Sequence, residues 1–393
     1  MRASMISAAV VAAFVGYGST IALVLAAAQA VGADAAQTAS WVLAVCVAKA
    51  VGSIGLSIWA RIPMILAWST PGAALIAATT GITMEEAVGA FILAGALIML
   101  TGLIRPLARL IGRIPDGVAA GMLAGVLLPF VLALAPAAVS EPASVLPMAL
   151  VFLLLRRVNP SYAVLAALAV GSGLAFVTGA AAPVEGAFVA PRAIFIRPAF
   201  EPGALIGLGL PLYLVTMASQ NLPGFATLRA SGYEPPVAPA LTASGALSAI
   251  AAFFGAHTVN MAAITAAICL GDDVHPDRNE RWRVGIAYGA VWIALGLSGP
   301  LVVALMEALP APVMAALVGI ALLGPITGAM TAALVPDGSR FAAVITLVVT
   351  ASGMSLFGIG AAFWGLAAGL FTLAIERLQP GRAFGAASSS RPR

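Results

Sequence analysis

Long apolar stretches, separated by short polar segments, run along almost the whole chain of 393 residues. Most of these stretches approach the roughly 20 residues that an α-helix needs to cross the hydrocarbon core of a membrane. We therefore predict an all-α membrane protein with about 14 transmembrane segments, two of them short and broken. The approximate ranges are 6–30, 38–60, 62–79, 87–104, 114–134, 144–155, 162–180, 203–228, 236–255, 257–270, 282–301, 313–334, 340–353 and 356–375.

The first broken segment contains the sequence Ser69-Thr70-Pro71-Gly72. Thr is a good N-cap and Pro is favoured at the first helical position, so Thr70 is expected to cap a helix that ends near residue 79. Such a helix rises only about 15 Å, which is half of the hydrocarbon core. The stretch 62–68 before it, if extended, completes the crossing.

The second broken segment lies 188 positions later, at His257-Thr258-Val259-Asn260. It predicts an extended stretch over 251–256 and a half-helix that starts at Thr258 and ends at Ile268. A helix that starts inside a membrane has unpaired N–H groups and a partial positive charge in its first turn, and lipid cannot satisfy these donors. Two such breaks in corresponding positions of two halves point to a transporter's binding site.

Each break falls in the third segment of a run of seven, which predicts a 7+7 inverted repeat with halves at 1–200 and 201–380. An N-terminus in the cytoplasm places 16 of the 18 arginines inside and leaves only Arg192 and Arg197 outside. This asymmetry follows the positive-inside rule. We therefore expect both termini in the cytoplasm, with residues 381–393 as a disordered basic tail.

Composition supports a membrane protein, because 62% of the residues are hydrophobic and 9% are charged, against about 25% charged in soluble domains. The cytoplasmic arginines account for the pI near 9.5, so no nucleic-acid partner is expected. Neither Cys46 nor Cys269 belongs to a metal-binding pattern, and no nucleotide-binding or hydrolase motif is present. We expect no cofactor, no metal and no enzymatic activity. A channel is disfavoured because no filter sequence or ring-forming charged motif occurs.

Four stretches spread over the chain resemble the bacterial benzoate:proton symporter family. They are Ala67–Leu75 (AWSTPGAAL), Leu214–Gly224 (LVTMASQNLPG), Ala262–Cys269 (AAITAAIC) with His275-Pro276-Asp277 and Arg281-Trp282, and Ala351–Gly365 (ASGMSLFGIGAAFWG). That family is similar in organisation to the nucleobase and sulfate/bicarbonate transporters.

The resemblance implies a core domain from about 1–104 and 203–301, and a gate domain from about 105–200 and 302–380. It also implies a homodimer formed through the gate domains, in the bacterial inner (cytoplasmic) membrane. The expected function is proton-coupled import of benzoate or a similar aromatic monocarboxylate by alternating access. A carrier of the same fold for a nucleobase or an inorganic anion is the alternative.

The candidate site departs from that of nucleobase carriers, which are expected to place one carboxylate on segment 8 and another on segment 10. Here the polar residues of these segments are neutral amides, hydroxyls and a histidine, which suit an anion because amides donate hydrogen bonds. The alternatives are interhelical hydrogen bonds for the amides and ordinary packing for the aromatic residues. The predicted substrate-binding residues are Ser69, Thr70, Pro71, Gly72, Gln220, Asn221, Thr258, Asn260, Tyr17 and Trp68.

Two groups are candidates for proton coupling. His257 lies at the second break and has an ordinary pKa near 6.5, so it is suited to titrate in the working range; the alternative is a structural polar cap. Lys49 is the single lysine and lies near the middle of segment 2, where a charge costs at least about 2.5–3.5 kcal/mol. Its alternatives are snorkelling to a surface and a carbonyl contact.

Overall fold

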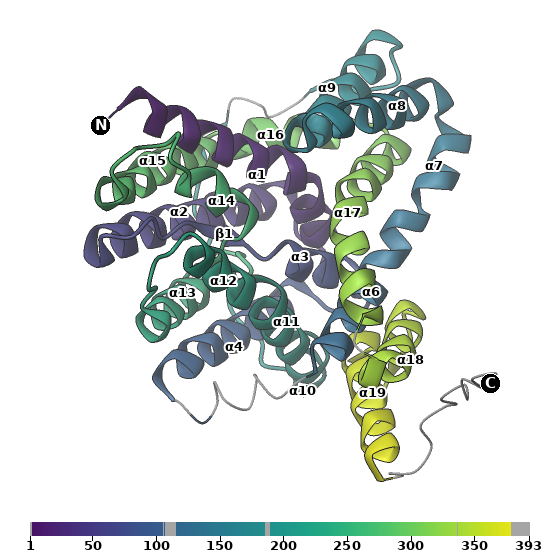
Figure 1. Cartoon of the computed structure of the whole chain (residues 1–393). Coiled ribbons are helices and arrows are strands. Elements are labelled where there is room, and N and C mark those ends of the chain that lie inside the picture. Colours follow the sequence, from purple (N-terminus) through teal and green to yellow (C-terminus); the bar gives the residue numbers. More distant parts are fainter. Residues whose placement is uncertain (1, 105, 107–114, 185–188, 336, 379–393) are drawn as a thin grey trace, which may run out of the picture.

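The computed structural model describes residues 2–104, 106, 115–184, 189–335 and 337–378. The predicted disordered tail at 381–393 therefore lies outside the described residues. The described part of the chain is mostly helical (Figure 1). The first half contains α1 (Ala3–Ala30), α2 (Ala35–Ala60), β1 (Leu66–Trp68), α3 (Thr70–Ala77), α4 (Met84–Leu103), α6 (Asp116–Leu132), α7 (Leu134–Ser140), α8 (Pro142–Val158) and α9 (Pro160–Val177).

The second half begins with one long helix made of α10 (Pro202–Ala204), α11 (Leu210–Thr216) and α12 (Leu222–Ala230). The π-helical turns η1 (Leu205–Gly209) and η2 (Met217–Asn221) join these pieces. The following elements are α13 (Val237–Ala252), β2 (Val259–Met261), α14 (Ile264–Leu270), η3 (Arg278–Arg283), α15 (Val284–Leu297), α16 (Gly299–Glu307), α17 (Ala311–Leu334), η4 (Asp337–Ser339), α18 (Arg340–Ala351), β3 (Ser355–Leu356), β4 (Ile359–Gly360) and α19 (Ala361–Leu378).

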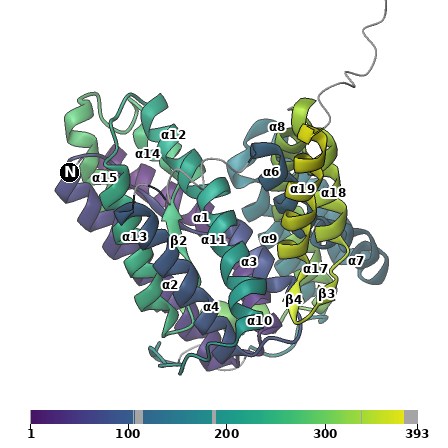
Figure 2. The same ribbon diagram turned by 90° about the horizontal axis from the view of Figure 1, so that it is seen from below.

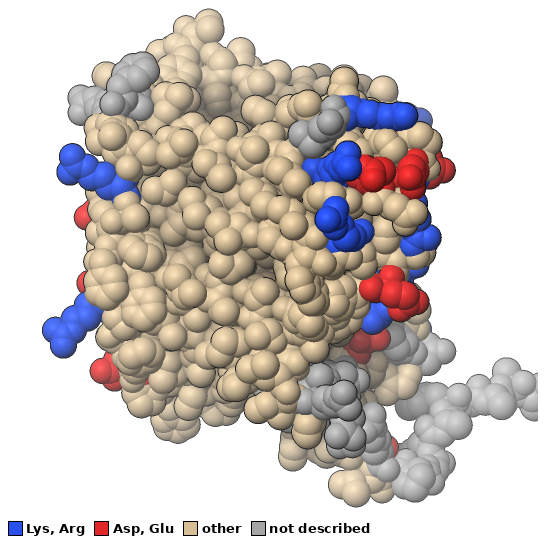
Figure 3. Space-filling view, turned by 90° about the vertical axis from the view of Figure 1, so that its left-hand side faces the viewer, with Lys and Arg blue, Asp and Glu red and all other residues tan. Residues whose placement is uncertain are grey.

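Six described helices are long and apolar enough to cross a membrane, and the count reaches seven if the bent pair 278–297 and 299–307 is one span. This pair bends by 53°. The six are Ala3–Ala30, Ala35–Ala60, Met84–Leu103, Asp116–Ser140, Pro202–Ala230 and Ala311–Leu334. Figure 3 shows charged side chains along two opposite edges of one face, separated by a broad uncharged band. The chain is therefore a multi-pass helical membrane protein.

Local capping explains why two of these helices start where they do. The Asp34 side chain accepts a hydrogen bond from the Gln37 backbone N–H, and the Gln37 side chain accepts one from the Asp34 backbone N–H. Thr83 and Glu86 form the same reciprocal pair before α4. Each capping box satisfies two N–H groups that the first turn of a helix leaves unpaired.

The two broken segments meet through a short antiparallel pair of strands. In this pair Leu66 lies opposite Met261, and Trp68 lies opposite Val259. Because α3 follows β1 and α14 follows β2, the two half-helices leave this ribbon in opposite directions. Their first turns therefore lie close to the same pair of strands.

The structure corrects the predicted starts of both half-helices. The N-cap of α3 is Ser69, whose hydroxyl accepts a hydrogen bond from the Gly72 N–H; Thr70 is the first helical residue. The second half-helix begins at Ile264, and Thr258 precedes an extended strand. The half-helices thus start 194 positions apart (70 and 264), and the predicted offset of 188 was wrong. The reason is that pairing with β1 holds residues 259–261 extended.

The end of the chain also differs from the prediction. The segment predicted over 356–375 begins as a helix only at Ala361, because residues 355–360 form the β3–β4 hairpin. Phe357 and Gly358 at its tip both have positive φ, at 54° and 73°, a backbone conformation typical of tight hairpin turns.

The helices form two bundles that lie side by side (Figure 2). The first bundle contains α1–α4 and α10–α15, and the second contains α6–α9 and α17–α19. The β1–β2 ribbon and both half-helices belong to the first bundle. Both broken segments are therefore held within one bundle, beside the second.

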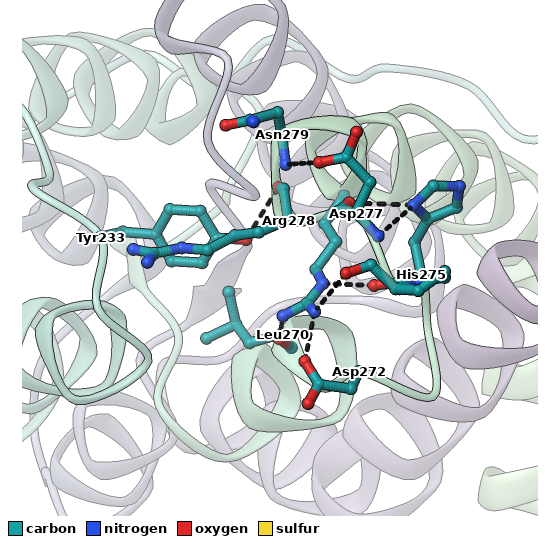
Figure 4. Close-up of polar contacts among 9 residues, drawn as sticks. Tyr233, Leu270, Asp272, His275, Asp277, Arg278 and Asn279 are labelled. Atoms are coloured by element: carbon teal, nitrogen blue, oxygen red, sulfur yellow. Dashed lines mark hydrogen bonds and ion pairs between the residues drawn. The ribbon is translucent and has the colours of Figure 1, made fainter.

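A buried arginine, Arg281, binds the C-terminal end of α14 and the loop that follows it. Figure 4 labels its partners Leu270, Asp272 and His275. Arg281 donates hydrogen bonds to the carbonyl oxygens of Leu270 and His275, at 2.7 and 2.6 Å, and it forms an ion pair with Asp272. The Leu270 carbonyl is one of the acceptors that the last turn of a helix leaves free. Nearby, burial raises the pKa of the Tyr233 hydroxyl, although Arg281 and Arg278 counteract this rise.

Candidate substrate site

A cavity of about 550 Å³ lies between the two bundles. Its walls contain polar and aromatic residues from the first bundle and mostly apolar residues from the second. No Asp or Glu occurs among the described residues that line it. Those used below are Thr20, Lys49, Trp68, Thr70, Pro71, Gln220, Thr265 and Tyr288 from the first bundle, and Leu123, Phe152, Arg156 and Ile320 from the second.

The first turn of α3 forms part of the cavity wall through Thr70 and Pro71. Ser69 is fully buried, and its hydroxyl caps this turn. Gly72 allows the close packing of the turn, because a Cβ there would lie 2.6 Å from a methyl carbon of Leu212. The four residues of the first break thus divide into two that face the cavity and two that shape the helix start.

A hydroxyl network ties this helix start to the second break. Thr216 donates a hydrogen bond to the Ser69 hydroxyl at 3.0 Å and lies 2.9 Å from the Thr258 hydroxyl. The Ser69 N–H donates to the Thr258 carbonyl, also at 3.0 Å. All three side chains are fully buried, so Thr258 joins the two broken segments and does not cap a helix.

The amides of η2 point in different directions. Gln220 lines the cavity, and its Oε1 accepts a hydrogen bond from Asn260 Nδ2 at 3.4 Å. Asn221 is fully buried, and its Oδ1 accepts a hydrogen bond from the Met261 N–H at 2.9 Å. Asn260 is also fully buried and donates a second bond to the Met261 carbonyl. Of these amides, Gln220 faces the cavity, whereas Asn221 and Asn260 hold strand β2.

Lys49 and an aromatic cluster form the wall beside these breaks. The Lys49 Nζ lies 2.9 Å from the centre of the Trp292 ring and 4.1 Å from that of Trp68. Trp68 and Trp292 meet edge to face at 5.1 Å, and Tyr17 lies 5.8 Å from each of them. Trp68 also donates a hydrogen bond to the Thr20 hydroxyl. Tyr17 therefore supports the rings that flank Lys49.

The other proton-coupling candidate, His257, lies apart from this cluster. Its Nδ1 accepts a hydrogen bond from Trp41 Nε1 at 2.9 Å, and the two ring centres are 5.7 Å apart. The imidazole is fully buried, and its Nε2 has no hydrogen-bond partner among the described residues. The described cavity wall contains Lys49 but not His257.

Several residues of the cavity were not predicted from the sequence. Thr20 and Tyr288 line it from α1 and α15, and Phe152 and Arg156 line it from α8. Thr20 and Tyr288 are polar residues within apolar segments, and this signal in the sequence could have identified them. No local signal marks the contribution of α8, because that helix reaches the cavity only through the packing of the two bundles.

Broken helices that meet at a cavity between two helical bundles are typical of membrane transporters. The chain belongs to the family described as benzoate membrane transport protein, whose model matches residues 1–375. This membership confirms the family predicted from the sequence. Since the family consists of membrane transporters, it also confirms that the protein is not an enzyme.

Two curated relatives cover nearly the whole chain. Inner membrane protein YdcO of Escherichia coli (strain K12) is 41% identical over 359 residues, which are 91% of this chain and 92% of the relative. The benzoate membrane transport protein of Acinetobacter baylyi is 38% identical over 360 residues, 91% of each chain.

Solved structures show the same fold at low sequence identity. The overall structure of SLC26A9 matches with a TM-score of 0.64 and 12% identity over 95% of this chain, which corresponds to 65% of that chain. The transmembrane domain of the cyanobacterial bicarbonate transporter BicA matches with a TM-score of 0.60 and 13% identity, over 94% of this chain and 98% of that one. The protein therefore has the helical transporter fold of these two proteins.

Proposed function

We propose that this protein is a proton-coupled secondary transporter that imports benzoate or a similar aromatic monocarboxylate across the bacterial inner membrane. The observation that carries this proposal is the cavity at the two helix breaks. It combines aromatic rings, hydroxyls, an amide and two basic side chains, Lys49 and Arg156, and its described lining has no acidic residue. Such a lining suits a flat apolar ring with one negative charge, because rings pack on rings and N–H and O–H groups donate to carboxylates.

The proposed transport cycle is alternating access. The bundle with the two broken segments acts as the core domain (about 1–104 and 203–301), and the other acts as the gate domain (about 105–200 and 302–380). We propose that 14 segments form the 7+7 inverted repeat, with both termini in the cytoplasm and a homodimer formed through the gate domains. Rocking of the core against the gate would expose the cavity to each side in turn.

Within the proposed site, Trp68, Thr70, Pro71 and Gln220 contact the substrate. The remaining predicted residues support these contacts. Ser69 and Gly72 shape the start of α3, Tyr17 backs the aromatic cluster, and Asn221, Thr258 and Asn260 hold β2 beside β1. His257 and Lys49 are the candidates for binding the cotransported proton. Of the two, Lys49 is favoured because it lines the cavity.

Uptake by the purified protein in liposomes tests the proposed substrate class. We expect radiolabelled benzoate to accumulate, excess unlabelled benzoate to compete, and uracil and sulfate to leave uptake unchanged. Protein-free liposomes measure the passive entry of benzoic acid. Competition by uracil or sulfate, or uptake no faster than in protein-free liposomes, would assign the carrier to a different substrate.

A further inference from the structure

Lys49 is a buried cation without a protein counter-ion among the described residues. It lies on α2, and only 1% of its surface is exposed. Its Nζ contacts the faces of Trp292 and Trp68. No described carboxylate lies within ion-pairing distance of it, since the two ion pairs of the described chain involve Arg281 and Arg283.

Buried polar atoms without a hydrogen-bond partner also lie in the surroundings of Lys49. The Tyr17 hydroxyl, the Trp292 Nε1 and the Thr265 hydroxyl are all buried and have no hydrogen-bond partner among the described residues. A Cβ at Gly16 would lie 3.2 Å from Thr265 and 3.4 Å from Trp292, so these two side chains lie close together beside α1. Buried polar groups in native proteins are usually hydrogen-bonded. Unpaired donors beside an unpaired cation therefore suggest a site for an anion.

Cation–π contacts do not remove the need for a counter-ion. They stabilise a desolvated cation by about 2 kcal/mol, whereas the desolvation of an ion inside a protein costs several kcal/mol. The titratable or charged groups that face Lys49 or share its cavity are Cys46, Tyr17, Tyr288, His257 and Arg156, and none of them is an acid that is negatively charged at neutral pH. No described group therefore supplies the negative charge that the protonated form of Lys49 needs, and a bound anion would supply it.

We infer that the carboxylate of the transported substrate is the counter-ion of Lys49. This inference rests on the proposed function and specifies its chemistry. The carboxylate pairs with the ammonium group, and the aromatic ring of the substrate packs against the indoles that flank it. The site therefore selects planar aromatic monocarboxylates over neutral analogues of the same shape, because only the carboxylate neutralises the buried charge.

Benzoate and benzamide test this selectivity, because they share shape and differ in charge. Binding to the purified full chain is measured by ligand-induced thermal stabilisation. We expect the wild type to prefer benzoate by at least about 30-fold, the factor that corresponds to losing one partner of a buried charge pair. In Lys49→Met the affinity for benzoate should fall by a similar factor, and that for benzamide should change by less than about 3-fold.

Arg61→Met is the matched control. Arg61 lies at the end of the same helix and also stacks on an indole, that of Trp282, at 4.3 Å. It does not line the cavity, so the variant should keep the preference for benzoate. A Lys49→Met variant that keeps the wild-type preference would overturn the inference.

The single lysine allows a second test that needs no substitution. Protein labelled with ¹³C-lysine gives one ε-carbon resonance, because the chain contains one Lys. Saturating benzoate should shift this resonance, and benzamide should not. If benzoate stabilises the wild type and the resonance stays in place, the inference fails while the proposed function stands. If the wild type does not bind benzoate at all, the proposed function itself fails.

Discussion

Gln220 and Asn221 are adjacent in the chain but contact different partners. Gln220 faces the cavity, whereas Asn221 accepts a hydrogen bond from the backbone of strand β2. We therefore expect Gln220→Leu to raise the KM for benzoate by about 3- to 10-fold, the effect of one hydrogen bond, and to leave stability unchanged. Asn221→Leu should lower stability by about 1–3 kcal/mol, because it leaves the Met261 N–H buried and unpaired.

Thermal unfolding in detergent and uptake kinetics in liposomes separate these two effects. Each variant is the control for the other, because both replace a neutral amide by the same apolar side chain in the same turn. A lowered melting temperature in Gln220→Leu, or an unaltered one in Asn221→Leu, would contradict the assigned roles.

The sequence identified the helix breaks but not the direction of each side chain. Trp68, Thr70 and Lys49 were predicted at the site, and the structure places them on the cavity wall. Thr258 was predicted to be a cap, and it instead bonds to Thr216. The pattern of a single segment cannot distinguish these cases, because the partners come from segments that are distant in the chain.

The C-terminal end of half-helix α14 depends on Arg281. This guanidinium is 5% exposed and binds the Leu270 and His275 carbonyls as well as Asp272. Hydrogen bonds to charged groups are each worth about 1.5–3 kcal/mol. We expect Arg281→Met to lower the melting temperature clearly and to reduce benzoate uptake, because α14 contributes residues to the cavity.

Arg283→Met is the control for this experiment, because Arg283 lies in the same short helix, η3. It forms a surface ion pair with Glu280, in which the side chains are 44% and 35% exposed, and its guanidinium lies 5.6 Å from the centre of the Trp282 ring. Exposed pairs contribute about 0–1 kcal/mol, so this variant should unfold at nearly the wild-type temperature. Equal losses in the two variants would show that Arg281 has no special role in holding α14.

Helix boundaries were most predictable where local signals agree. The helices α2, α4 and α17 lie within about three residues of their predicted ranges, because long apolar runs and local turn residues define them. The second half-helix was misplaced by six residues, from Thr258 to Ile264. Residues 259–261 are extended only because they pair with β1, which lies almost 200 positions earlier in the chain.

At the scale of the whole molecule, the candidate substrate cavity lies where the two bundles meet. The first bundle supplies Lys49, Trp68 and Gln220, and the second supplies mainly apolar residues such as Leu123, Phe152 and Ile320. In the proposed cycle the polar groups that contact the substrate therefore move together with the core domain. The gate domain moves relative to them, and few hydrogen bonds between the domains have to break. Sequence patterns could not predict this division of the cavity wall, because it depends on how the bundles pack.

The proposed coupling to protons concerns the transporter as a whole. Benzoate is almost fully ionised at neutral pH, so its entry against a negative-inside potential is uphill by about 2.3 kcal/mol per 100 mV for one charge. Cotransport of one proton cancels this charge. We expect uptake into proteoliposomes to rise as external pH falls, to be abolished by a protonophore, and to move no net charge.

If the proton binds at the cavity, His257 is not required for coupling, because it does not line the described cavity wall. We therefore expect His257→Phe to keep accumulation driven by the pH gradient. The same variant should lower stability, because it removes the acceptor of the Trp41 hydrogen bond.

An imposed potassium diffusion potential, with no pH gradient, separates this mechanism from transport of the bare anion. A positive-inside potential should leave the initial rate unchanged if one proton accompanies each benzoate, and it should accelerate uptake if the anion moves alone. Protein-free liposomes, run in parallel, measure the passive entry of benzoic acid. Acceleration by the potential would refute proton coupling, and a flattened pH dependence in His257→Phe would assign the proton to the histidine.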